Sequence, residues 1–210
     1  MWRLCLALVL LTLPVSGTLL AQSRVRTETI RPVPAPTPAI KFEADPHIAA
    51  DSARVAAADI SNDLSQLPPA VARTRERILA AARSGDLQKL VAVMQTSETI
   101  PVFSFTEDKD PIAFWKANYR DSEGIEVLSI LTAILETGFV HVDQGTPQEV
   151  YLWPYFARMP LDALTPEQKV ELFRIVTGGD YKDMVDFGAY SFYRLGIAPD
   201  GGWQFFVSGD

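Results

Sequence analysis

His141 and Asp143 form the first of three groups of side chains whose types and spacing are suited to chemistry. They lie two positions apart in a run that alternates like a β-strand. Residues at this spacing face the same side of a strand, so the carboxylate could orient the imidazole as a general base. No nucleophile motif accompanies the pair. A partly exposed histidine at the end of a strand is the simpler interpretation.

Three aspartates form the second group. Asp180, Asp183 and Asp186 are spaced three apart along an expected helix. Carboxylates on one face can perform acid–base chemistry on a glycan or hold a divalent cation. Helix capping and the helix dipole explain Asp180 and Asp183 without chemistry. A cell-wall-directed hydrolase using paired carboxylates, such as Asp143, Asp183 or Asp186, is therefore an alternative function.

Late aromatic side chains form the third group. Tyrosine and tryptophan combine a flat apolar body with a polar handle, which suits sugar rings, peptides and small apolar ligands. On hairpins one set of these rings can fill the core while the other faces a groove, although helices covering both sets would make all of them core. The expected ligand-binding residues are Tyr151, Trp153, Tyr155, Tyr193, Arg194 and Trp203.

The common catalytic and cofactor motifs are missing from the sequence. It has no nucleophile elbow, no phosphate-binding loop and no dinucleotide fingerprint. His47 and His141 are its two histidines, too few for a histidine-rich metal site. Pro111 and Ile112 occupy positions where a calcium loop starting near Asp108 needs ligands. We therefore expect no cofactor and no metal, and favour a non-enzymatic protein.

Residues 1–21 have the pattern of an export signal. Arg3 precedes the apolar run from Leu4 to Leu13, and a small-residue exit at Ala21 follows. Cleavage after Ala21, or alternatively after Gly17, predicts a periplasmic or secreted protein. Retention as a membrane anchor is the other possibility, and only then do we expect membrane contact. Cleavage also removes Cys5, the single cysteine, so the processed chain can form no disulfide.

Residues 22–66 are expected to be a linker, largely disordered and rich in proline and alanine. Proline alternates with other residues from Arg31 to Pro38, which favours an extended, semi-rigid spacer. The following alanine-rich stretch buries little apolar surface. A tail without a role is the alternative interpretation.

Charge excludes two classes of partner. The net charge is −7, and from Gly85 onward nine basic side chains face nineteen acidic ones. Such a surface repels nucleic acid and anionic lipid. The partners that remain are an envelope protein, a glycan or a small apolar ligand.

Residues 67–210 are expected to form a single α+β domain. Pro69, the helical spacing that follows it and Gly85 predict a first helix, and Asp86 caps a second, so the two form a helical hairpin. Further helices are expected to start at Pro111 and to span 123–136, 165–176 and 180–187, the third burying Val170, Phe173 and Val176. Strands are expected at 100–105, 139–143, 149–153, 190–197 and 203–207, the last four pairing as antiparallel hairpins around turns at 144–147 and 198–202.

Two segments carry a family resemblance. The run Ala80–Leu90 resembles the opening helices of NTF2-like (SnoaL-like) domains, and Asp200–Phe205 looks like their last hairpin. This resemblance implies a curved sheet wrapped by helices around a pocket, and it carries over no catalytic residue. The segment Tyr151–Ala157 with the tail Tyr193–Trp203 also looks like exported bacterial proteins of no assigned function. We therefore expect an exported binding module, with a structural stabiliser of an envelope complex as a third alternative.

Overall fold

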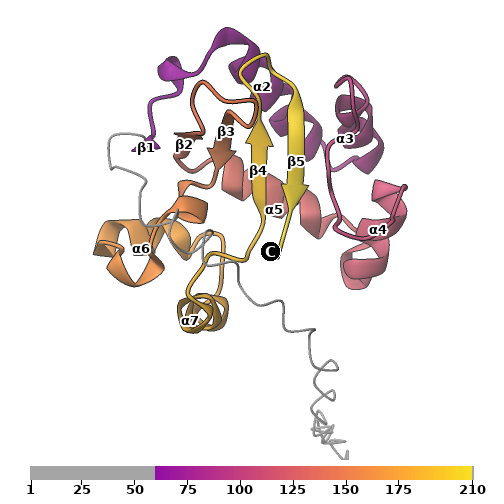
Figure 1. Ribbon diagram of the computed structural model, residues 1–210. Coiled ribbons are helices and arrows are strands. Elements are labelled where there is room, and N and C mark those ends of the chain that lie inside the picture. Colours follow the sequence, from indigo (N-terminus) through magenta and orange to yellow (C-terminus); the bar gives the residue numbers. More distant parts are fainter. Residues whose placement is uncertain (1–59, 210) are drawn as a thin grey trace, which may run out of the picture. The chain divides into compact units, whose positions relative to one another are not determined.

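A five-stranded antiparallel sheet organises the computed structural model, which describes residues 60–209 (Figure 1). Its strands follow the chain in the order β1-β2-β3-β4-β5, so each strand pairs with the next one. The strands are β1 Ile60–Ser61, β2 Phe139–Val142, β3 Val150–Trp153, β4 Arg194–Ile197 and β5 Trp203–Val207. The expected hairpins β2–β3 and β4–β5 are both present.

Helices flank this sheet. The α-helices are α2 Pro69–Arg83, α3 Leu87–Met94, α4 Pro111–Asn118, α5 Glu126–Leu135, α6 Pro166–Leu172 and α7 Gly178–Phe187. Short 3-10 helices are η3 Leu64–Gln66, η4 Arg120–Ser122, η5 Tyr155–Arg158 and η6 Leu161–Ala163. The α+β class predicted from the sequence is confirmed.

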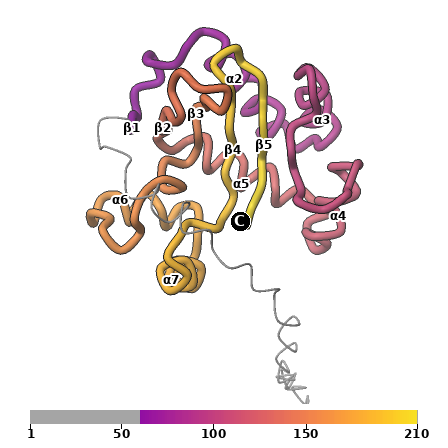
Figure 2. Tube along the Cα trace, in the orientation of Figure 1, coloured from indigo at the N-terminus to yellow at the C-terminus, as the bar shows by residue number. Residues whose placement is uncertain are grey.

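The two faces of the sheet belong to two hydrophobic clusters. On one face, residues such as Tyr151, Trp153 and Leu195 pack with α2, α3, α4 and α5. On the other, Val150 and Leu152 pack with η5, η6, α6 and α7. Neighbouring residues of β3 thus alternate between the clusters, and all four of its residues are buried. Both views of the chain show α2 and α5 behind the sheet and α6 and α7 beside its lower end (Figures 1 and 2).

The first two helices pack against each other as the sequence predicts. Pro69 stands at the first helical position of α2, where its missing N–H costs no hydrogen bond. Gly85 adopts a φ of +71°, and the Asp86 carboxylate accepts the Gln88 backbone N–H at 2.9 Å to open α3. A tight connection between α2 and α3 follows from this turn.

Two expected boundaries differ in the structure. Ile60 and Ser61 pair with Val140 and Phe139, so the sheet includes residues before the expected boundary at Leu67. The expected strand 100–105 is reduced to one bridge at Val102, parallel to β5. Pro101 has no N–H to extend that bridge.

Several helix predictions need correction. Positive φ angles at Glu123 and Gly124 delay α5 to Glu126. Val170 on α6 and Phe173 at its C-cap, both expected to be buried, are 70% and 47% exposed. Leu172 is buried in their place, whereas Val176 is buried as expected, so only part of the predicted inward face faces the core.

Helix α7 starts earlier than expected. Thr177, rather than Asp180, is its N-cap, and Gly178 and Gly179 open the helix instead of ending the previous one. A glycine is tolerated there because the first backbone N–H groups of a helix have no intrahelical partner. Asp180 completes a capping box with Thr177.

The predicted export signal, residues 1–21, and the linker up to residue 59 lie outside the described residues. Within residues 60–209, no helix combines the length and the hydropathy of a membrane span.

The β4–β5 turn is fixed against the start of α2. Gly201 has a φ of +91°, and a Cβ added there would lie 2.9 Å from the Ala70 carbonyl oxygen. The Thr74 hydroxyl donates to the Gly201 carbonyl at 2.7 Å. The backbone of the β4–β5 turn therefore packs directly against the backbone of α2, and position 201 has no room for a side chain.

Replacing Gly201 with alanine should test this approach. Gly145 is a matched control, because its φ is also positive (+76°) and a Cβ there meets nothing within 4 Å. We expect Gly145→Ala to cost about 1–2 kcal/mol of unfolding free energy from the left-handed backbone alone. Gly201→Ala should cost about 1–3 kcal/mol more because backbone must move. Equal losses in chemical denaturation would contradict this packing.

Candidate functional site

The aromatic residues expected to bind a ligand lie in the two clusters. Tyr151, Trp153, Tyr193 and Trp203 belong to the first cluster, and Tyr155 to the second. None is more than 7% exposed. Helices thus cover both sets of rings, the alternative that the sequence had left open. Ligand binding by these residues stays a prediction, and their packing accounts for their apolar character.

The hydroxyl groups of Tyr155 and Tyr193 have protein partners. Tyr155 donates to Glu171 at 2.8 Å, and Tyr119 donates to Tyr193 at 2.9 Å. Burial first, and the hydrogen bond second, raise the pKa of Tyr155 and of Tyr119. The remaining expected residue, Arg194, is half-buried and donates to the Gly209 carbonyl. The Tyr155 and Tyr119 hydroxyls therefore remain neutral hydrogen-bond donors at physiological pH.

His141 has a carboxylate partner, but it is Glu149. The His141 Nε2 and Glu149 Oε1 atoms are 2.8 Å apart, and the imidazole stacks on Tyr151 at 4.1 Å between ring centroids. The Gly145 backbone N–H donates to Glu149 at 2.8 Å. This hydrogen bond first, and His141 second, lower the pKa of Glu149. The pair holds the β2–β3 turn closed across its base.

Asp143 does not join that pair. It follows β2 with a φ of +56°, so the strand alternation that predicted a shared face ends before it. Its carboxylate is 3.9 Å from Arg158. The sequence predicted a strand up to Asp143, whereas β2 ends at Val142.

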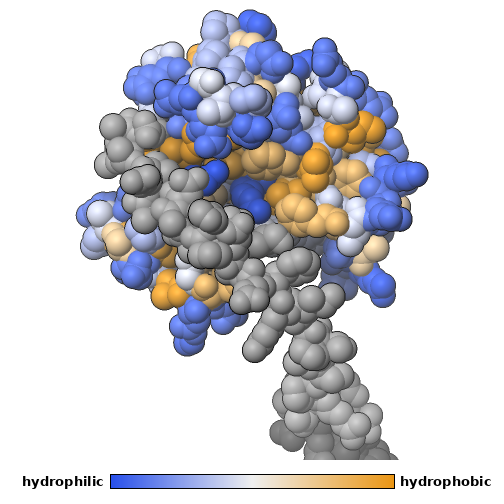
Figure 3. Space-filling model, viewed as in Figure 1, coloured by the Kyte–Doolittle hydropathy of each residue, from blue (hydrophilic) through white to orange (hydrophobic). Residues whose placement is uncertain are grey.

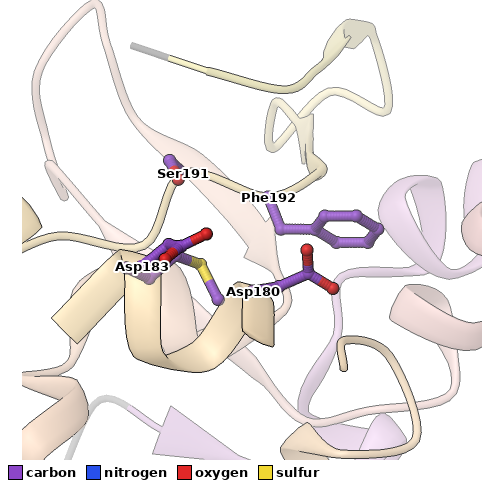
Figure 4. A pocket seen from close by; sticks show the side chains of 5 residues that line it. Asp180, Asp183, Ser191 and Phe192 are labelled. Atoms are coloured by element: carbon purple, nitrogen blue, oxygen red, sulfur yellow. The ribbon is translucent and has the colours of Figure 1, made fainter. Parts of the chain in front are cut away.

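Two of the three aspartates share a shallow pocket. Asp180, Asp183 and Met184 line it from α7, and Ser191 and Phe192 close its other side (Figure 4). Its volume is about 210 Å³. Asp180 is held by the Thr177 backbone N–H at 2.8 Å, whereas Asp186 forms an ion pair with Lys182. Within residues 60–209, the Asp183 carboxylate accepts no hydrogen bond and so remains available.

An exposed apolar surface lies beside β5, and we call it the apolar ledge. Val102 and Phe205 are partners in the parallel bridge, so their side chains lie next to each other on one face. Val102 is 49% exposed, and Ile100 and Phe105 on its flanks are 54% and 61% exposed. Figure 3 shows apolar side chains gathered over β5 and the segment beside it. The apolar ledge consists of Ile100, Val102, Phe105 and Phe205.

A glycine shapes the inner side of the apolar ledge. Phe205 pairs with Gly196 across β4 and β5. A Cβ at Gly196 would lie only 2.4 Å from the Phe205 ring. The ring therefore lies over the glycine and close to the sheet, as aromatic residues do opposite strand glycines. Its half-buried outer side is a flat platform next to Val102.

Sequence reasoning missed this surface because it assigned Ile100–Phe105 to a strand. One signal was available in the sequence. Ile100, Val102 and Phe105 are apolar, yet Pro101 interrupts the strand and a polar stretch follows at once. Ser104 and Thr106 join their side chains to Asp108 in that stretch. The backbone thus leaves the sheet before a full strand can form.

No family model, no curated protein and no solved structure matches this chain. The resemblance to NTF2-like domains stays a prediction. Residues 60–209 bring no three His, Cys, Asp or Glu side chains together in a way that would hold a metal ion.

The Glu149 contacts predict a pH-dependent stability. The folded pKa of Glu149 lies below its ordinary value of 4.5, so its stabilisation is complete above that pH and is lost as the pH falls through the folded pKa. Glu149→Gln should therefore unfold more easily than the native chain at pH 7, and this difference should shrink by pH 3. Denaturation curves across this range check it.

Glu98→Gln is a suitable control for this measurement, because Glu98 is exposed and accepts no hydrogen bond from residues 60–209. It should change stability little at any pH. If Glu149→Gln lowers the unfolding free energy by the same amount at pH 7 and pH 3, the carboxylate charge does not stabilise the turn.

Proposed function

We propose that this protein is an exported, non-enzymatic binding module of the cell envelope, which docks a segment of a partner protein on the apolar ledge. The exposure of Val102 beside Phe205, with exposed Ile100 and Phe105 on either side of Val102 in the chain, is the observation that carries the proposal. Contiguous exposed apolar groups of this kind commonly mark interaction sites. Fully burying one Val or Phe side chain is worth about 1.5–3 kcal/mol.

The structure also favours a particular way of docking. Val102 already uses the edge of β5, since its N–H donates to Gln204 at 2.9 Å and its carbonyl accepts from Phe206 at 2.7 Å. Pro101 next to it has no N–H to donate. A partner therefore packs side chains onto the face of the sheet instead of adding a hydrogen-bonded strand at its edge.

The envelope location rests on the export signal. Arg3, the apolar run and Ala21 support it. A structural stabiliser of an envelope complex would bury the same ledge permanently.

The hydrolase alternative needs two carboxylates free to act on opposite sides of a bond. Asp180 and Asp183 share the pocket, but Asp180 is committed to the capping box of α7. Asp186 is paired with Lys182, and Asp143 lies near Arg158. These commitments favour the binding module.

Site-specific photo-crosslinking tests the proposal. A photoreactive phenylalanine analogue replaces Val102 in one full-length chain and Val170 in another, and both chains are expressed in cells and recovered from the envelope. Val170 is the matched control because it is 70% exposed on α6. We expect a discrete adduct from position 102 and none of the same mass from position 170.

Two serine variants link this adduct to the apolar ledge. Phe105→Ser should reduce its yield about tenfold, since burial of one phenylalanine is worth at least that much. Phe173→Ser, which removes an exposed ring at the C-cap of α6, should leave the adduct yield unchanged. Identical adducts from both positions, or a yield that ignores Phe105→Ser, would refute docking at the apolar ledge.

A further inference from the structure

The apolar ledge and the acidic pocket lie along one line of the sheet. Phe205 pairs with Gly196, and Val207 pairs with Arg194 two residues further on. The Gly209 N–H then donates to the Ser191 carbonyl at 2.8 Å, and Ser191 lines the pocket. At the rise of an extended strand, Phe205 and Gly209 are about 13 Å apart.

Negative charge surrounds both ends of this line. In the pocket, Asp180 and Asp183 project from α7 opposite Ser191 and Phe192 (Figure 4). Lys182 on the same helix pairs with Asp186 and not with Asp183. At the other end, Glu107, Asp108 and Asp110 follow Phe105, with Lys109 as the one cation among them. Arg194, between the two ends, donates to the Gly209 carbonyl.

We propose that the segment docked on the apolar ledge is an extended, basic peptide of a partner protein, with an apolar side chain against Phe205 and a Lys or Arg about four residues away in the Asp183 pocket. The proposal rests on the function proposed above and adds the chemistry of the partner. Charge complementarity carries it, because an apolar segment with acidic flanks would be repelled at both ends.

The expected preference is modest and depends on salt. Pairs of exposed charges favour binding by no more than about fivefold. Salt near 0.5 M shortens the range of the interaction well below the 8 Å of physiological buffer. A basic peptide should therefore outcompete its acidic twin about fivefold at low salt, and about equally at 0.5 M.

Disulfide tethering measures this preference even when free peptides bind weakly. Once residues 1–21 are removed the chain has no thiol, because Cys5 is its single cysteine. Val102→Cys therefore introduces a unique thiol. Two peptides compete for this thiol in a reducing buffer. Each has a cysteine next to a phenylalanine, and four residues from the phenylalanine one peptide has Lys and the other has Glu. Mass spectrometry of the mixed disulfides gives the ratio of products.

We expect a Lys-to-Glu ratio of about five at low salt, falling towards one with Asp183→Asn but not with Asp121→Asn, an exposed control on η4. A ratio of one with the unaltered pocket would overturn the basic partner.

A third peptide, with serine in place of phenylalanine, tests docking itself. If it competes equally at Val102→Cys, the apolar ledge does not bind, and the proposed function fails as well. If only the charge preference is missing, docking survives without its basic partner.

Discussion

Burial of β3 on both sides is the constraint on which the rest of the structure depends. Val150 and Leu152 face one cluster while Tyr151 and Trp153 face the other, and no residue of this strand is left to solvent. A strand of this kind needs a layer of helices on each face. Helices α2 and α5 supply one layer, and η5, η6, α6 and α7 supply the other. The second layer packs mainly with residues of β2 and β3, and the same face of β4 and β5 contributes half-buried Phe205 to its edge.

The apolar ledge follows from this unequal cover. Phe205 lies over Gly196 and packs only at the margin of the second cluster. Val102 is the bridge partner of Phe205 and remains 49% exposed. Because neighbouring Phe103 points to the opposite face and packs on Phe114 and Trp115, Val102 is held with its side chain outward. Burial of one residue thus enforces exposure of the next.

The sequence predicted the elements better than their partners. The proline and glycine signals around α2 and the β4–β5 turn act locally, and both elements formed as expected. Glu149 lies eight residues from His141, beyond the reach of strand alternation, so the imidazole was paired with Asp143 instead. The aromatic residues had two possible environments, a covered core or an open groove, and the positions of the helices decide between them. Ile100–Phe105 resembled a strand in composition, but Pro101 and the Ser104–Asp108 contacts end it.

Photochemical carbene footprinting of the full-length chain, read out by mass spectrometry, tests most directly whether the apolar ledge is open to solvent. The account predicts that Val102 and Phe105 are labelled as strongly as Val170, which is exposed on α6, while Val150 and Leu152 remain unlabelled. Labelling of Val102 and Phe105 at the level of Val150 would mean that this face is already covered in the isolated protein. The apolar ledge would then not be an open binding surface.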